Sequence, residues 1–492
     1  MNFVLIQTDQ QRFDSLGCCG NRIVRTPALD ALASRGVVFD YAFTPIPLCA
    51  PARASLMTGK RPEKHGILFN EESGTVGGRD FNGWHVFLPE LLRSRGYRCF
   101  QAGKWHIGTD IKPSDRGFDG VFYPGYGYPD SHPHYLEYLR SMKTKFELTD
   151  IAYSRRPDGS AKYALSAVQK GPEKASVPYY ITTQAISEIR QANLAGEQFF
   201  VQLDFWGPHA PYILPERYAR MYDPASIPPW PNLDDDLSGK PEIQRFYREY
   251  WGIEKFTWDD WSRLAAMLYG SVTQIDDQVA RVIKTLNELG IADDTAVIFV
   301  ADHGGMAGSH GLEDKGPYLY DEICRVPMIA SVPGGASGAR SEALVYNADL
   351  MPTILDLVGC YIPVELDFVS LAPILMGTGR SARDPHEPAY VTFHGHQTPC
   401  EQRMVRTREA KYVFNAAASD ELYDLVSDPY EMRNVAGKPE CHGLLREMRL
   451  LMRARLIETR DTMLTFFEGS RVPDTGADSP VGLSSTGRIE WR

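Results

Sequence analysis

The chain has 492 residues, of which 43% are hydrophobic and 23% are charged, a composition that is ordinary for a globular protein with a sizeable core. Its formal net charge of −11 argues against nucleic acid or an anionic membrane as a partner. The sequence shows no apolar run of membrane-spanning length, no signal-peptide pattern and no regular spacing of its eight cysteines. We therefore expect a cytoplasmic protein with reduced thiols.

Apolar segments alternate with helical patterns over the first 300 residues or so. Four β-branched or aromatic runs predict buried parallel strands, at 3–7, 97–102, 198–205 and 296–301. Helical periodicity is found at 26–35, 86–95, 181–193 and 258–289. This alternation predicts an α/β fold, with a large doubly wound and mostly parallel sheet flanked by helices.

The pattern changes beyond about residue 380. Short antiparallel strands are expected at 389–393, 402–407 and 411–415, followed by a segment at 421–428 and a helix at 442–462. We divide the chain into a large domain (1–380), a smaller C-terminal α+β domain (381–468) and an aperiodic tail (469–492). The poorly periodic segment 125–178 is expected to be a surface loop, with a substrate-facing insertion as the alternative.

Polar residues that can do chemistry follow each of the four predicted strands. They are Asp9 and Gln10 after the first strand, Lys104 and His106 after the second, His209 after the third, and Asp302 and His303 after the fourth. In doubly wound sheets, ligands bind beyond the carboxyl ends of the strands. The sequence therefore predicts that these side chains converge on a single site.

Cys49 precedes a short run of helix-forming residues. Pro51 and the residues up to Leu56 predict a helix that places the Cys49 thiol on its first turn. Free amides and the positive end of the helix dipole attract anions there. This pattern indicates an anion-facing nucleophile, and the alternative is a buried, inert cysteine.

Residues 49–59 resemble the signature of the type I, formylglycine-dependent sulfatases of the alkaline phosphatase superfamily. They read Cys-x-Pro-x-Arg and, after one residue, Ser-Leu-Met-Thr-Gly. Segments around Lys104, His209 and Lys315, with the run 423–434, extend this likeness from residue 1 to about residue 465. The resemblance implies that Cys49 is converted to formylglycine by the dedicated modification machinery.

The resemblance also implies one divalent metal ion, with calcium as the first expectation and manganese or magnesium as the second. The implied ligands are Asp9, Gln10, the modified residue at Cys49, Asp302 and His303. Many sulfatases have Asp where this chain has Gln10, and some have Asn where it has His303. The glutamine in place of an aspartate makes the site less negative.

Catalytic roles follow from the same resemblance, for Cys49, Arg53, Lys104, His106, His209 and Lys315. Cleavage of a sulfate monoester moves negative charge onto the bridging oxygen, so cations must surround the sulfuryl oxygens and an acid must lie near the leaving oxygen. We expect Lys104 and Lys315 to supply the cations and His106 to act as a base. His209 or Lys315 would serve the leaving oxygen, and Arg53 would hold the nucleophile.

The implied activity is hydrolysis of a small-molecule or saccharide sulfate ester to an alcohol or phenol and inorganic sulfate. The alternative is a phosphonate monoester or phosphodiester hydrolase of the same superfamily, with sulfatase activity as a side reaction. Lys104 and His106 favour the sulfatase. A non-catalytic anion- or glycan-binding protein would require decay among these residues, which the sequence does not show. Aryl, sugar and alkyl sulfates stay open as substrates, and so does a homo-oligomer.

Overall fold

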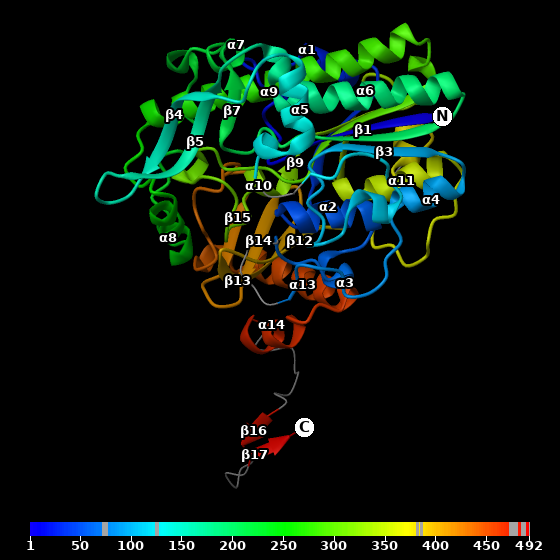
Figure 1. Ribbon diagram of the computed structural model, residues 1–492. Coiled ribbons are helices and arrows are strands. Elements are labelled where there is room, and N and C mark those ends of the chain that lie inside the picture. Colours follow the sequence, from blue (N-terminus) through cyan, green and yellow to red (C-terminus); the bar gives the residue numbers. More distant parts are fainter. Residues whose placement is uncertain are drawn as a thin grey trace.

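The computed structural model describes residues 1–70, 77–123, 127–379, 383 and 387–471, with two short strands at 481–483 and 489–491. A mixed eight-stranded sheet crosses the larger part of the molecule (Figure 1). Its strand order is β11-β2-β10-β8-β1-β6-β3, and β9 pairs with β2. The predicted α/β class, with a large, mostly parallel sheet and a smaller antiparallel one, is confirmed.

The four predicted strands lie side by side and parallel in the order β8-β1-β6-β3. Their bounds are β1 (Asn2–Thr8), β3 (Arg98–Gly103), β6 (Phe199–Asp204) and β8 (Thr295–Ala301). The other half of the sheet is mixed, because β10 runs antiparallel to both β8 and β2. It contains β2 (Val37–Phe43), β9 (Arg325–Val326), β10 (Met328–Ser331) and β11 (Ala339–Tyr346).

Helices cover both faces of this sheet, and the side chains of β1 show how the layers are built. Val4 and Ile6 pack with α1 (Pro27–Ser34), α6 (Val177–Ala195) and α9 (Trp258–Glu288). Phe3 and Leu5 point the other way, as alternation along a strand requires. They pack in the cluster of α2 (Cys49–Thr58), α4 (Leu88–Ser94) and α11 (Leu350–Leu357). The result is a three-layer α/β/α domain, as Figure 1 shows.

The described part of the segment 125–178, residues 127–178, is largely regular secondary structure, so the expectation of a surface loop is wrong. It contains α5 (Pro133–Ser141), β4 (Leu148–Arg155) and β5 (Ala161–Gln169). β4 and β5 form an antiparallel hairpin, and β5 pairs in parallel with β7 (Tyr212–Pro215). Asp158-Gly159 at the tip is a recognised hairpin signal. Most residues of β4 are exposed, so its sequence lacks the alternation of hydrophobic and polar residues by which a strand is usually recognised.

The C-terminal sheet is antiparallel and follows chain order. Its strands are β12 (Ala389–His396), β13 (Thr398–Arg406), β14 (Ala410–Asn415) and β15 (Glu421–Asp424). One face packs on the large domain, where Val391 and Phe393 join Phe43 and Tyr318 in one cluster. The opposite face packs on α13 (His442–Thr459). Figure 1 shows this sheet in orange.

The expected division of the chain at residues 380 and 468 stays a prediction. Helix α14 (Leu464–Arg471) crosses the expected start of the tail, and β16 (Val481–Leu483) pairs with β17 (Ile489–Trp491) within it.

Among the described residues, no helix is long and apolar enough to cross a membrane. All eight cysteines lie in the described part of the chain and are free thiols. The remaining short helices are α3 (Pro62–His65), α7 (Glu216–Ala219), α8 (Glu242–Trp251), α10 (Asp321–Cys324) and α12 (Ala372–Leu375).

Candidate active site

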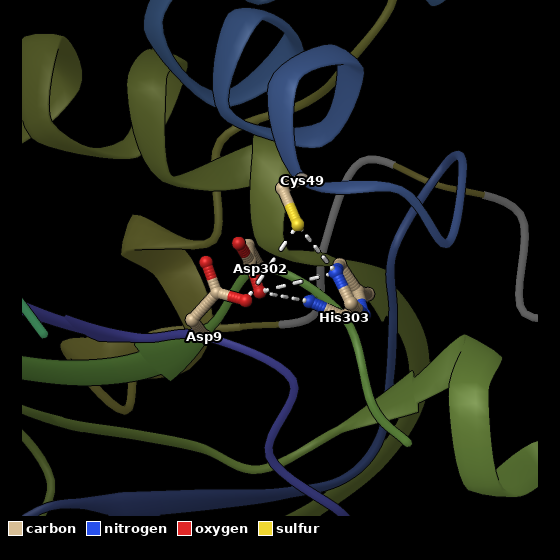
Figure 2. Close-up of side chains that lie close together, drawn as sticks. All are labelled: Asp9, Cys49, Asp302 and His303. Carbon is tan, nitrogen blue, oxygen red and sulfur yellow. Dashed lines mark hydrogen bonds and ion pairs between the residues drawn. The ribbon is translucent and has the colours of Figure 1, made fainter. Parts of the chain in front are cut away.

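The carboxyl ends of the parallel strands meet the start of α2 at one buried point. Asp9 follows β1, Asp302 and His303 follow β8, and Cys49 is the first residue of α2. One ligand atom from each of the four lies within 4.8 Å of the others, and all four residues are buried. Figure 2 shows their side chains pointing toward one another. The predicted convergence of these groups is therefore present in the structure.

Cys49 occupies the first turn of its helix, as the sequence predicts. Its Sγ lies 3.1 Å from Nε2 of His303 and 3.6 Å from Oδ1 of Asp9. The extended backbone of Leu48 begins the helix, and the next amide, of Ala50, donates to Oδ1 of Asn70 at 3.1 Å. All residues of α2 are buried. The thiol therefore faces the site from a fixed backbone.

Arg53, one helical turn beyond Cys49, is held by three carboxylates. Its guanidinium donates to Asp302 at 2.9 Å, to Asp9 at 3.0 Å and to Asp204 at 3.2 Å. It is 2% exposed, and its planar fork suits several oxygen partners at once. Burial alone would lower the pKa of Arg53, but the three carboxylates outweigh this effect and raise it. Arg53 thus positions Asp9 and Asp302 from beneath the site.

Lys104 also contacts Asp9, with 2.7 Å between Nζ and Oδ2. Burial opposes ionisation of Asp9, yet the charges of Lys104 and Arg53 hold the pKa of its carboxyl well below the usual range. Burial likewise opposes the charge on Lys104, and Asp9 raises the pKa of that ammonium. Both groups are therefore charged at neutral pH. His106 lines the same cavity.

Lys315 connects the remaining predicted residues. Its Nζ donates to Nε2 of His209 at 2.8 Å, to Oδ1 of Asp314 at 3.1 Å and to Oε1 of Gln10 at 3.2 Å. Burial and the charge of Lys315 lower the pKa of His209 to about 3, so its imidazole is neutral. Burial alone would lower the pKa of Lys315, but Asp314 raises it.

Three residues around the site have a left-handed backbone that side chains with a Cβ rarely adopt. The φ angles are 57° at Gln10, 49° at His106 and 62° at Asp314. Such conformations cost free energy and are found preferentially at functional sites. Gly305 packs closely against Gln10, since a Cβ at Gly305 would lie 2.7 Å from Cγ of Gln10. The backbone therefore shapes this site at the expense of local stability.

The donor set fits a single divalent cation. Asp9 and Asp302 offer hard carboxylate oxygens, and Sγ of Cys49 stands where the oxygens of a formylglycine would lie. Nδ1 of His303 lies 2.7 Å from the carbonyl oxygen of Gly304 and must carry the proton of that contact, which leaves Nε2 as an acceptor. Burial lowers the pKa of His303, as a neutral metal ligand requires. The ligand role of Gln10 stays a prediction, since its carbonyl oxygen accepts from Lys315.

A cavity of about 420 Å³ opens above these groups. Five predicted residues line it, namely Cys49, Lys104, His106, His209 and Lys315. The other five predicted residues, which are Asp9, Gln10, Arg53, Asp302 and His303, are buried and lie outside its lining. The site thus has a charged floor and an accessible space above it.

Sequence reasoning missed two residues of this arrangement, Asp204 and Asp314, and weighed a third, His396, either as a residue at the rim of the pocket or as a surface residue. Asp204 ends β6 and binds Arg53, and its position at a strand end was the available signal. Asp314 precedes Lys315 and lies 3.8 Å from both His209 and His396. His396, on β12 of the C-terminal sheet, also lines the cavity, and only the packing of the two sheets brings it there.

Comparisons with known proteins agree along nearly the whole chain. The sequence model of the family "Sulfatase" matches residues 1–360, and that of "N-sulphoglucosamine sulphohydrolase, C-terminal" matches residues 308–460. An arylsulfatase of Clostridium perfringens is 28% identical, covering 92% of this chain and 93% of the relative. An N-acetylglucosamine-6-O-sulfatase of Bacteroides thetaiotaomicron is 24% identical, and the match covers 92% of this chain and 85% of that relative. The crystal structure of a phosphonate monoester hydrolase of Agrobacterium radiobacter shares the fold, with a TM-score of 0.77 and 24% sequence identity. The superposition covers 100% of this chain and 99% of that structure.

Proposed function

This chain belongs to the sulfatase family and is a sulfuric ester hydrolase, and we propose that it works through a formylglycine made from Cys49 and one divalent cation. The observation that carries the proposal is the contact of Cys49 with Asp9 and His303 at the start of α2, beside two buried lysines. An inert structural cysteine has no need of such surroundings. The proposed substrates are sulfate monoesters of small alcohols, phenols or saccharides.

Asp9, Asp302 and His303 would hold the cation, with calcium as the first candidate. When present, the cation and the modified residue supply a nucleophile of lowered pKa at the point where Sγ of Cys49 lies. Arg53 keeps Asp9 and Asp302 in place through bonds of 3.0 and 2.9 Å. This support leaves the carboxylates oriented before substrate binds.

Lys104 and Lys315 line the cavity on the substrate side and are the groups that bind sulfuryl oxygens. Both ammonium groups have raised pKa values and are already oriented by carboxylates. They therefore stabilise charge that develops in the transition state without reorganising. Lys315 also donates to neutral His209, which places a positive donor and an imidazole where a leaving oxygen would lie. The role of His106 as a base stays a prediction.

The phosphonate monoester hydrolase is the competing assignment, because a solved structure of that class shares this fold along the whole chain. By the family resemblance Lys104 argues for the sulfate ester, because sulfatases carry a lysine at this position; here its buried ammonium lines the cavity and pairs with Asp9 at 2.7 Å. The two esters are alike in shape and charge demand, so hydrolysis of both by one site is physically reasonable. The rates of hydrolysis of a sulfate ester and of a phosphonate monoester, compared side by side, therefore decide between the two assignments.

The test combines peptide mass analysis with a pair of substrates. Protein made in a host with the modification machinery should carry formylglycine at position 49 and hydrolyse 4-nitrophenyl sulfate faster than a phenylphosphonate monoester. Cys49→Ala should abolish both activities. Cys99→Ala is the matched control, since Cys99 is also buried but lies in β3 outside the cavity lining. Full activity with an unmodified cysteine, or a strong preference for the phosphonate, would contradict the proposal.

A further inference from the structure

Asp204 is the third carboxylate that binds Arg53, and it lies outside the proposed metal ligands. It ends β6, is 0% exposed, and accepts from Nη1 of Arg53 at 3.2 Å. It is also outside the lining of the cavity, so contact with substrate does not explain its burial. Burying a carboxylate is costly unless its partners compensate. The partners of Asp204 therefore indicate what this residue does.

Two glutamines of the central sheet hold the carboxylate of Asp204. Nε2 of Gln101, on β3, donates to Oδ2 at 2.8 Å, and Nε2 of Gln202, on β6, donates to Oδ1 at 3.1 Å. Gln101 lies opposite Gln202 in the parallel register of the two strands. Alternation along β6 places Gln202 and Asp204 on the same face as Phe200, which packs in the cluster of α2. Asp204 therefore connects Arg53, on α2, to the central sheet.

Each nitrogen of the Arg53 guanidinium has its own carboxylate. Nε donates to Asp302, Nη2 donates to Asp9, and Nη1 donates to Asp204. Burial raises the pKa of Asp204 to about 6, although Arg53 and the two glutamine amides lower it, so the carboxyl group is mostly ionised at neutral pH. Its charge balances the attraction of Arg53 toward the other two carboxylates. Three charged partners thus fix both the place and the orientation of the guanidinium.

The same arrangement holds the backbone of Lys104 from both sides. The amide of Lys104 donates to the carbonyl oxygen of Asp204 at 3.0 Å. The carbonyl oxygen of Lys104 accepts from Nη1 of Arg53 at 3.1 Å, and this is the nitrogen that binds the Asp204 carboxylate. Gly103 permits the close approach of the two strand ends, since a Cβ there would lie 1.9 Å from the carbonyl oxygen of Asp204. Asp204 contacts Lys104 directly and also through Arg53.

From these contacts we infer that Asp204 is a positioning residue, which fixes Arg53 and through it the place of Lys104 in the active site. The inference rests on the proposed function, because the position of Lys104 matters only if its ammonium binds the sulfuryl oxygens. Asp204 acts on the reaction through these two neighbours and not by contact with substrate. A misplacement of about 1 Å in such a group can cost on the order of 10²-fold in rate.

Asp204→Asn tests this role, because it keeps the shape of the side chain and removes its charge. We expect kcat for 4-nitrophenyl sulfate to fall about tenfold with little change in KM, since a displaced Lys104 loses contacts that strengthen in the transition state. Metal content, measured by elemental analysis, should stay the same. Gln101→Leu removes one anchor of the carboxylate and leaves its charge, so it should lower kcat by a smaller factor.

A double variant separates positioning from a general structural effect. In the Lys104→Ala protein, Asp204→Asn should lower kcat less than about threefold, because the group that Asp204 positions is already absent. Asp276→Asn is the matched control. Asp276 is equally buried, on α9, and accepts from the amides of Ala28 and Leu29 at 3.0 and 2.8 Å, outside the cavity lining. This control should leave kcat unchanged with and without Lys104.

Three results would overturn the inference. They are an unchanged kcat in folded Asp204→Asn protein, a tenfold fall that is equally large in the Lys104→Ala protein, and loss of bound metal from Asp204→Asn protein. If Asp204→Asn protein does not fold, Gln101→Leu decides by the same criteria. A parent protein that hydrolyses no sulfate ester would contradict the proposed function and this inference together, whereas an active parent with unaffected variants contradicts the inference alone.

Discussion

Two parts of the site differ in how their polar groups are paired: the floor, formed by Asp9, Arg53, Lys104 and Asp302, and the wall above it, formed by Tyr163, Trp206, Trp251 and Gln274. On the floor, the charges of Asp9, Arg53 and Lys104 are matched by one another within 3.0 Å. On the wall, Trp206 and Gln274 keep buried polar atoms without partners among the described residues. An ion pair fixes the geometry of its two buried charges. A buried polar group without a hydrogen-bond partner instead raises the free energy of the folded protein.

This difference separates the two tasks of the site. The floor needs fixed charges, because the sulfate group is the same in every substrate and its transition state demands preorganised cations. The wall surrounds the space beside the reacting group, where the leaving group of the ester would lie, and the leaving group differs among substrates. Substitutions in the floor should therefore affect all sulfate esters alike, and substitutions in the wall should affect only some of them.

The largest effect is expected from Asp302→Ala. Its carboxylate is a proposed ligand and also binds Arg53 at 2.9 Å, so its loss removes a ligand and leaves a buried cation less well paired. We expect loss of the bound metal, measured by elemental analysis, and loss of activity toward every substrate. Asp293→Ala, at an exposed position, is the control. Stoichiometric metal in folded Asp302→Ala protein would show that the ligand assignment is wrong.

Lys104→Ala should have the next largest effect. Loss of one preorganised electrostatic donor costs on the order of 10²-fold in turnover. We expect this loss for both aryl and sugar sulfates, with a smaller loss for a phosphonate monoester. Exposed Lys284 provides the matched Lys→Ala control. Equal losses for sulfate and phosphonate would remove the argument that Lys104 selects the sulfate ester.

Tyr163→Ala should separate wall from floor. Tyr163 lines the cavity against Trp251, so its loss should raise KM for a sugar sulfate by about tenfold with little change in kcat, the signature of lost ground-state binding. Tyr153→Ala is the control on the same hairpin, because Tyr153 is 37% exposed and does not line the cavity. A fall in kcat for all substrates would assign Tyr163 to the catalytic floor instead.

The smallest effect concerns the junction of the two sheets, where His394 lies between two carboxylates. Its Nε2 is 2.9 Å from Glu63, near α2, and its Nδ1 is 3.0 Å from Glu401. Burial alone would lower the pKa of His394, but Glu401 and Glu63 raise it. A raised pKa in the folded state means that protonation stabilises the fold. This contribution is complete below the ordinary histidine pKa of about 6.5 and is lost as pH rises through the folded value.

His394→Gln should therefore destabilise the protein by about 2 kcal/mol at pH 6, a typical value for hydrogen bonds to a charged group. The difference from the parent protein should shrink as pH rises toward 9, which urea unfolding at several pH values can measure. His442→Gln, at an exposed residue, should show no such trend. Activity at pH 6 should change little, because His394 does not line the cavity. A difference in stability that is constant with pH would contradict the protonated state.

Much of the floor could be predicted because it depends on local sequence. Asp9, Lys104 and Asp302 could be identified because they directly follow buried strands. Pro51 and its neighbours indicated that a helix begins at Cys49. Each signal involves fewer than a dozen consecutive residues, over which strand and helix patterns are reliable. By contrast, the mixed half of the sheet escaped prediction, since β10 has only four residues and β11 is partly exposed.

Local sequence patterns suffice for the fold class, the charged residues at the strand ends and the position of Cys49, because alternation, helix starts and strand ends are local properties of a chain. Long-range packing is what brings Arg53 to three carboxylates and places Trp251, Gln274 and Glu313 around one cavity. These residues lie on elements separated by many residues, and their meeting depends on how the hairpin, α8 and α9 pack. The shape and polarity of the space above the floor therefore depend on long-range packing.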